Sequence, residues 1–173
     1  MRVLGIDPGT VRMGYGVLNA GAKLDVEDYG VVSLPSRMPL EQRLYQLYTH
    51  VLNLISVFNP TEIAVEEPFV GRGERLFAGP ALAVGQAQAV VLIGAASQGI
   101  PIFGYSPAQI KRSITDHGAA SKEQMQDVIT ATLRLSETPE SDAADALSVC
   151  LCHLNHSQSD SALRREIPPG MER

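Results

Sequence analysis

Two short apolar segments that each end in an acidic residue constrain the fold of this chain most. Residues 3–6 run directly into Asp7, and residues 63–65 run directly into Glu66. Buried strands normally exclude carboxylates, because an ionised group loses its hydration there. Each acid therefore marks the end of a strand. If the two strands are neighbours in a sheet, both acids emerge at the same edge.

The remaining pattern predicts an α/β fold. We expect strands at 3–7, 14–18, 26–34, 62–66 and 100–105, and helices at 40–58, 81–98, 108–115, 122–135 and 141–154. In the clearest helix, apolar residues recur every three or four positions from Leu40 to Phe58, and Asn59-Pro60 ends it. The order of elements predicts a mixed five-stranded sheet flanked by helices on both faces, with the first three strands forming an antiparallel meander.

Length and composition indicate one domain. The 173 residues are expected to form a domain at 1–155 and a disordered tail at 156–173, which is rich in Ser, Asp and Arg. No apolar stretch is long enough to predict a transmembrane helix, and the N-terminus lacks the apolar core of a signal peptide. Two cysteines cannot build a disulfide framework. We therefore expect a soluble cytoplasmic protein without a membrane partner.

A second pair of acids points to metal chemistry. Asp142 and Asp145 are three residues apart in a predicted helix, so they share one face. If they meet Asp7 and Glu66, the four carboxylates repel one another unless a cation neutralises them. Oxygen-only ligands favour Mg²⁺ or Mn²⁺, and two such ions about 4 Å apart commonly hydrolyse phosphodiesters. Individually, Asp7 could instead cap its turn and Asp142 could be a helix N-cap.

Four short motifs occur in order along almost the whole chain, and together they resemble the RuvC family of bacterial Holliday junction resolvases. The motifs are Gly5-Ile6-Asp7-Pro8-Gly9-Thr10, Gly14-Tyr15-Gly16, Ala64-Val65-Glu66 and Asp142-Ala143-Ala144-Asp145. The resemblance implies an RNase H-like fold, a homodimer, and two Mg²⁺ ions per subunit, with Mn²⁺ as a substitute. It assigns catalysis and metal binding to Asp7, Glu66, Asp142 and Asp145, and it favours Glu66 over the neighbouring Glu67.

The activity that the resemblance implies is hydrolysis of a four-way DNA junction in recombination and repair. Paired symmetric nicks would leave 5′-phosphate and 3′-hydroxyl ends. A branch-migration helicase is implied as a partner in the same way. The alternative within this fold is a nuclease that processes ribosomal RNA precursors. An actin-like ATPase needs two lobes, for which the chain is too short, and four retained acids argue against a junction-binding protein without catalysis.

The formal net charge of −5 does not exclude a DNA partner, because the four acids account for most of it. Candidate phosphate contacts are the basic residues Arg72, Arg75, Lys111 and Lys122. The resemblance places Lys111 and Lys122 near the scissile phosphate. Phe69 could stack on opened bases, or it could anchor its loop in the core.

Several features leave alternatives open. Gly14 and Gly16 in a strand indicate either close approach of another backbone or a bulge. The Cys150, Cys152, His153 and His156 cluster resembles a soft-metal site, but its spacing on a helix favours packing. His117 could assist proton transfer. The apolar helix at 81–96 is the expected dimer contact.

Overall fold

A single mixed sheet organises the chain. The structure is a computed structural model that describes residues 1–68, 78–115 and 120–166. The strands are β1 (Arg2–Asp7), β2 (Arg12–Ala20), β3 (Leu24–Ser33), β4 (Glu62–Glu66) and β5 (Ile102–Tyr105). Their order is β3-β2-β1-β4-β5. The first three pair antiparallel, whereas β4 joins β1 and β5 in parallel. The predicted mixed sheet and its meander are confirmed.

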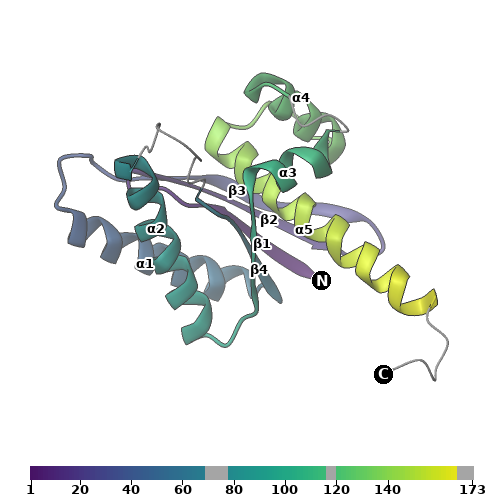
Figure 1. Cartoon of the computed structure of the whole chain (residues 1–173), viewed down its shortest axis with the longest axis horizontal. Helices are drawn as coiled ribbons and strands as arrows, with labels where there is room; N and C mark the ends of the chain where they lie inside the picture. Colours follow the sequence, from purple (N-terminus) through teal and green to yellow (C-terminus); the bar gives the residue numbers. More distant parts are fainter. Residues whose placement is uncertain (69–77, 116–119, 167–173) are drawn as a thin grey trace.

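Helices cover both faces of this sheet (Figure 1). The helices α1 (Leu40–Phe58) and α2 (Ala78–Ser97) lie on one face, and α3 (Pro107–Ile114), α4 (Lys122–Leu133) and α5 (Ser141–Glu166) lie on the other. Side chains alternate along β1, so that Val3 enters the core under α5, while Leu4 and Ile6 enter the core under α1 and α2. The alternation therefore builds two separate cores from one strand.

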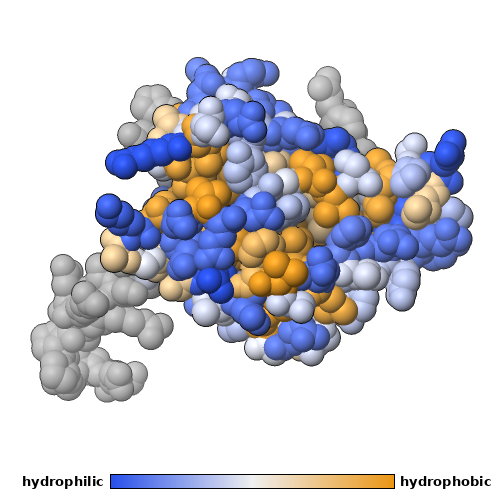
Figure 2. Space-filling model, turned by 180° about the vertical axis from the view of Figure 1, so that it is seen from behind, coloured by the Kyte–Doolittle hydropathy of each residue, from blue (hydrophilic) through white to orange (hydrophobic). Residues whose placement is uncertain are grey.

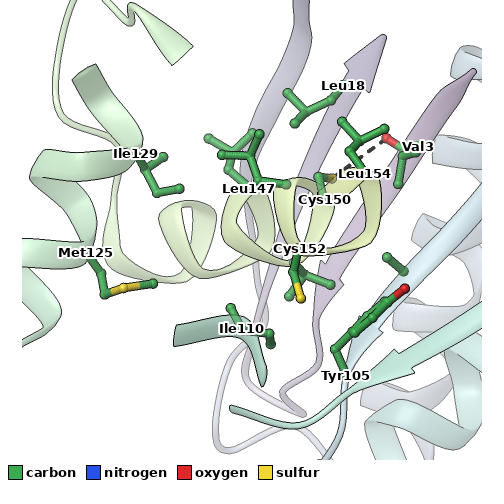
Figure 3. Close-up of a cluster of buried hydrophobic side chains, with 13 residues drawn as sticks. Val3, Leu18, Tyr105, Ile110, Met125, Ile129, Leu147, Cys150, Cys152 and Leu154 are labelled. Carbon is green, nitrogen blue, oxygen red and sulfur yellow. Dashed lines mark hydrogen bonds between the residues drawn. The ribbon is translucent and has the colours of Figure 1, made fainter. Parts of the chain in front are cut away.

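The core under α5 joins all three helices of that face (Figure 3). Ile110 from α3 and Met125 and Ile129 from α4 pack with Leu147 and Cys150 from α5. All five side chains are buried. This packing fixes α3 and α4 beside the N-terminal half of α5, which is the end of the helix that carries the two aspartates.

Glycines let α5 lie against the sheet at very short range. A β-carbon on Gly14 would collide with the carbonyl oxygen of Asp142, and one on Gly5 would collide with the carbonyl oxygen of Ala146. At Gly16 the obstacle would be the side chain of Leu147. Of the two explanations for Gly14, close backbone approach is confirmed. The irregularity in the β2–β3 register lies elsewhere, between Val17 and Leu18.

The last helix is longer than its pattern predicts. It continues past Leu154 to Glu166, so residues 156–166 are helical, contrary to the expected disorder of this segment. Residues 167–173 lie outside the described residues, and the domain boundary at 155 stays a prediction. No helix in the described ranges is long and apolar enough to cross a membrane.

Apolar side chains also reach the surface. Seen from behind, they gather in patches separated by polar side chains (Figure 2). Among the exposed large apolar residues, Leu82, Leu92 and Ile93 all belong to α2. This helix is therefore apolar both toward the core and toward the outside.

The glycine contact gives a first prediction. We expect Gly14→Ala to lower the free energy of unfolding by about 1–3 kcal/mol, because the added methyl group pushes the start of α5 off the sheet. Chemical denaturation measures this change. Gly21→Ala is the matched control, because a β-carbon there meets only an ordinary contact with the carbonyl oxygen of Lys23. Equal stability of the two variants would contradict the close-approach interpretation.

Candidate active site

Parallel pairing of β1 and β4 brings two acids to one edge of the sheet. Ile6 is in register with Val65, so Asp7 and Glu66, the next residues along the two parallel strands, lie at the same end of the sheet. Asp145 comes from the first turns of α5, which crosses this edge. These three acids share a cavity of about 320 Å³, whose lining residues are Asp7, Glu66, Pro107, Ile110, Lys111, Lys122, Met125 and Asp145. The predicted convergence is therefore observed for three of the four acids.

Burial and mutual repulsion disfavour ionisation of these acids. Burial, together with the charges of Asp145 and Asp142, raises the pKa of Asp7 to about 7. Burial, and then the charges of Asp7 and Asp145, raise the pKa of Glu66 to about 8. Burial also raises the pKa of Asp145, although Lys122 opposes it. A cluster of this kind gains stability from any positive charge placed among its oxygens.

Two lysines supply part of that charge. Lys122 is the first residue of α4, which begins at a capping box formed by Ser121 and Gln124. Its Nζ lies 3.6 Å from Oδ2 of Asp145. Lys111 belongs to α3, and its Nζ donates a hydrogen bond of 3.3 Å to the carbonyl oxygen of Ala120. The structure thus places both predicted lysines beside the acids.

Asp142 does not join the other three acids, contrary to the prediction from the sequence. It is not among the residues that line the cavity. Its Oδ2 instead accepts a hydrogen bond of 2.5 Å from Nε of Arg12, whose second guanidinium nitrogen lies 2.7 Å from Oε2 of Glu140. Sequence reasoning missed Arg12, because nothing in its local pattern indicates a partner 130 residues away.

The choice between the two adjacent glutamates is clear from the geometry. Glu66 lines the cavity, whereas Glu67 is exposed. The carboxylate of Glu67 lies against Gly104 of β5, on the opposite side of the strand, where it would obstruct a β-carbon. Strand alternation therefore sends only Glu66 to the face covered by α5, as the resemblance favours.

The other candidate residues lie outside the described part of the chain or away from the cavity lining given above. Phe69, Arg72, Arg75 and His117 lie outside the described residues, so their roles stay predictions. Cys150 and Cys152 are free and buried. Both ring nitrogens of the buried His153 are engaged, Nδ1 with the hydroxyl of Tyr105 at 2.7 Å and Nε2 with Glu62. This agrees with packing instead of a soft-metal site.

The chemistry of the donor set suits a hard cation. Asp7, Glu66 and Asp145 offer only carboxylate oxygens, which Mg²⁺ and Mn²⁺ prefer. Within the described ranges, however, no group of three or more acidic, histidine or cysteine side chains is arranged so that it could hold a metal ion. Two features keep the carboxylates apart. The acids repel one another, and Asp142 is paired with Arg12.

Solved structures share this architecture. The chain superimposes on Thermus thermophilus RuvC in complex with a Holliday junction substrate with a TM-score of 0.82 and 35% identity, over 93% of this chain and 97% of that chain. The yeast mitochondrial Holliday junction resolvase Ydc2 shares the fold with a TM-score of 0.63 at 18% identity, over 93% of this chain and 83% of that one. The fold and the acids at its sheet edge define an RNase H-like nuclease domain.

Sequence relatives identify the family within this class. A protein from Dehalococcoides mccartyi called crossover junction endodeoxyribonuclease RuvC is 42% identical over 158 residues, which cover 90% of this chain and 93% of the relative. One from Chloroflexus aggregans with the same name is 43% identical, over 88% and 92% of the two chains. The family model for crossover junction endodeoxyribonuclease RuvC matches residues 3–153. The chain belongs to the RuvC family.

The raised pKa values predict how stability depends on pH. The folded protein keeps protons on Asp7 and Glu66 up to about pH 7 and 8, whereas the unfolded chain releases them near the ordinary values of 3.8 and 4.5. Because the folded state binds more protons in this window, metal-free stability falls as the pH rises from about 4 to 8. Denaturation in EDTA across this range measures the slope.

We expect the removal of one carboxylate to weaken the dependence of the free energy of unfolding on pH. We expect Asp7→Asn to stabilise the metal-free protein at pH 8 by about 1–3 kcal/mol, because it removes a buried charge from the repelling cluster. Glu67→Gln is the matched control, since Glu67 is exposed and lies outside the cavity. A slope unchanged by Asp7→Asn would show that burial and the neighbouring acids do not raise the pKa of Asp7.

Proposed function

We propose that this chain is a metal-dependent endodeoxyribonuclease that resolves Holliday junctions by paired symmetric nicks in homologous recombination and DNA repair. The observation that carries the proposal is the convergence of Asp7, Glu66 and Asp145 with two lysines in one cavity. Family membership supports it, because the relatives named above are crossover junction endodeoxyribonucleases. The solved complex of the Thermus thermophilus protein with a junction supports the same substrate.

The carboxylates are the proposed ligands of two Mg²⁺ ions, for which Mn²⁺ can substitute. Divalent ions held there would help to generate hydroxide from water and would stabilise the departing 3′ oxygen. Asp7 and Glu66 are fixed by neighbouring strands, and Asp145 is fixed by the packed start of α5. Asp142 completes the set when its carboxylate turns from Arg12 to the cavity. The products are 5′-phosphate and 3′-hydroxyl ends.

The lysines are proposed to hold the DNA backbone. Lys111 and Lys122 enter the same cavity from two different helices, so they can approach one phosphate from two directions. Their charges also lower the pKa of Glu66, which opposes the effect of burial. We extend the DNA surface to Phe69, Arg72 and Arg75 as base-stacking and phosphate contacts, and we retain a branch-migration helicase as a partner by family resemblance.

We propose that α2 forms the contact of a homodimer. Its outer side carries a row of exposed apolar residues at helical spacing, namely Leu82, Ala89, Leu92, Ile93 and Ala96. The occupant is a second copy of this chain, because two symmetric nicks require two symmetry-related cavities. A row that repeats about every seven residues can pack against its own copy across a two-fold axis.

Cleavage of a synthetic four-way junction tests the proposed activity. We expect symmetric nicks on the junction in Mg²⁺, none on linear duplex, and none in EDTA. Asp7→Asn and Asp145→Asn should each lower the cleavage rate by roughly 10²–10³-fold or more, because each removes a charge that holds the ions. Asp127→Asn on the exposed side of α4 is the control and should cleave normally.

Other outcomes of this experiment separate the alternatives. Tight junction binding without cleavage in Mg²⁺ or Mn²⁺ would leave a binding protein without catalysis. Cleavage of structured RNA in place of the junction would favour a nuclease that processes ribosomal RNA precursors.

Molar mass in solution tests the dimer. We expect Leu92→Glu to raise the dimer dissociation constant by roughly tenfold or more, because it buries a charge in an apolar contact. Leu24→Glu on the edge strand β3 is the matched control, since its exposed fraction of 43% is close to the 41% of Leu92. Light scattering after size exclusion measures both variants. An unchanged dimer for Leu92→Glu would place the contact elsewhere.

A further inference from the structure

Arg12 joins two acids at the start of α5. It is the first residue of β2, and its guanidinium lies between Asp142 and Glu140. Its side chain is about half exposed at 47%, while that of Asp142 is 26% exposed and that of Glu140 is 70% exposed. Arg12 thus bridges the partly buried Asp142 and the exposed Glu140.

The pairing separates Asp142 from the other three acids. Asp7, Glu66 and Asp145 line the cavity, but Asp142 does not. Asp142 is nevertheless close enough for its charge to raise the pKa of Asp7. Asp142 also lies on α5 only three residues before Asp145, which lines the cavity, so it is the fourth carboxylate near this edge.

We propose that Arg12 is a positioning residue that holds Asp142 away from the cavity in the metal-free protein and releases it when metal binds. This inference rests on the proposed metal-dependent function. Arg12 supplies the positive charge that Asp142 needs while the cavity is without an ion. When metal binds, the ion replaces the guanidinium of Arg12 as the partner of the Asp142 carboxylate.

The energetics favour an exchangeable contact. Ion pairs that are open to solvent contribute little stability, because water already solvates both groups. Glu140 gives the released guanidinium a second partner, so Arg12 stays paired when Asp142 leaves. The free energy needed to separate Asp142 from Arg12 is therefore small. Metal binding must supply this free energy, so the ion pair lowers the metal affinity of the site by a small factor.

Binding of Mn²⁺ to the DNA-free protein tests the proposal. Electron paramagnetic resonance measures the concentration of free Mn²⁺. It therefore gives the affinity of the full chain for Mn²⁺ independently of nuclease activity. We expect Arg12→Gln to tighten Mn²⁺ binding about two- to fivefold, since the competing ion pair is lost. Arg12→Met should do the same if the glutamine variant folds poorly, and Arg37→Gln is the control for removing one exposed positive charge that does not line the cavity.

A double-mutant cycle separates this mechanism from a general charge effect. In an Asp142→Asn background, Arg12→Gln should leave Mn²⁺ affinity unchanged, because the group through which Arg12 acts is gone. The same gain in both backgrounds, or weaker binding by Arg12→Gln in the parent, would overturn the proposal. Absence of Mn²⁺ binding by the unmodified protein would instead overturn the metal site, and the proposal with it.

Discussion

The close contact between α5 and the sheet is the constraint on which the site depends. Gly5 and Gly14 lack the side chains that would hold the helix backbone away from β1 and β2. Because α5 carries Asp145 while β1 carries Asp7, any increase in their separation would open the cavity directly. The glycines therefore help to hold the acids of the cavity together through packing alone.

The same contact makes the site electrostatically unfavourable in the absence of metal. Burial raises the pKa of Asp7, Glu66 and Asp145, and the acids repel one another. The protein offsets part of this cost with its own cations, Lys122 beside Asp145 and Arg12 beside Asp142. A cavity that destabilises its own carboxylates would gain from cations bound among them, so the electrostatic cost of the site and the proposed metal binding have one origin.

Much of this arrangement could be predicted from local pattern. Apolar runs that end in Asp7 and Glu66 indicated two strand ends, and the helical spacing of Asp142 and Asp145 put both on one face. The mixed sheet and its meander followed from the order of elements, and both are confirmed. Element ends were predicted less well, as α5 shows by continuing to Glu166, because the polar residues after Leu154 carry no apolar pattern.

The sequence by itself determined the elements and the kinds of residue at their ends, because periodicity and turn chemistry act between near neighbours. Only the tertiary structure decided which groups meet. Parallel pairing of β1 with β4 put Asp7 beside Glu66, and alternation turned Glu66 to the cavity and Glu67 away from it. Pairing of Arg12 with Asp142 joins residues 130 positions apart, and such contacts depend on packing in space, which no local pattern records.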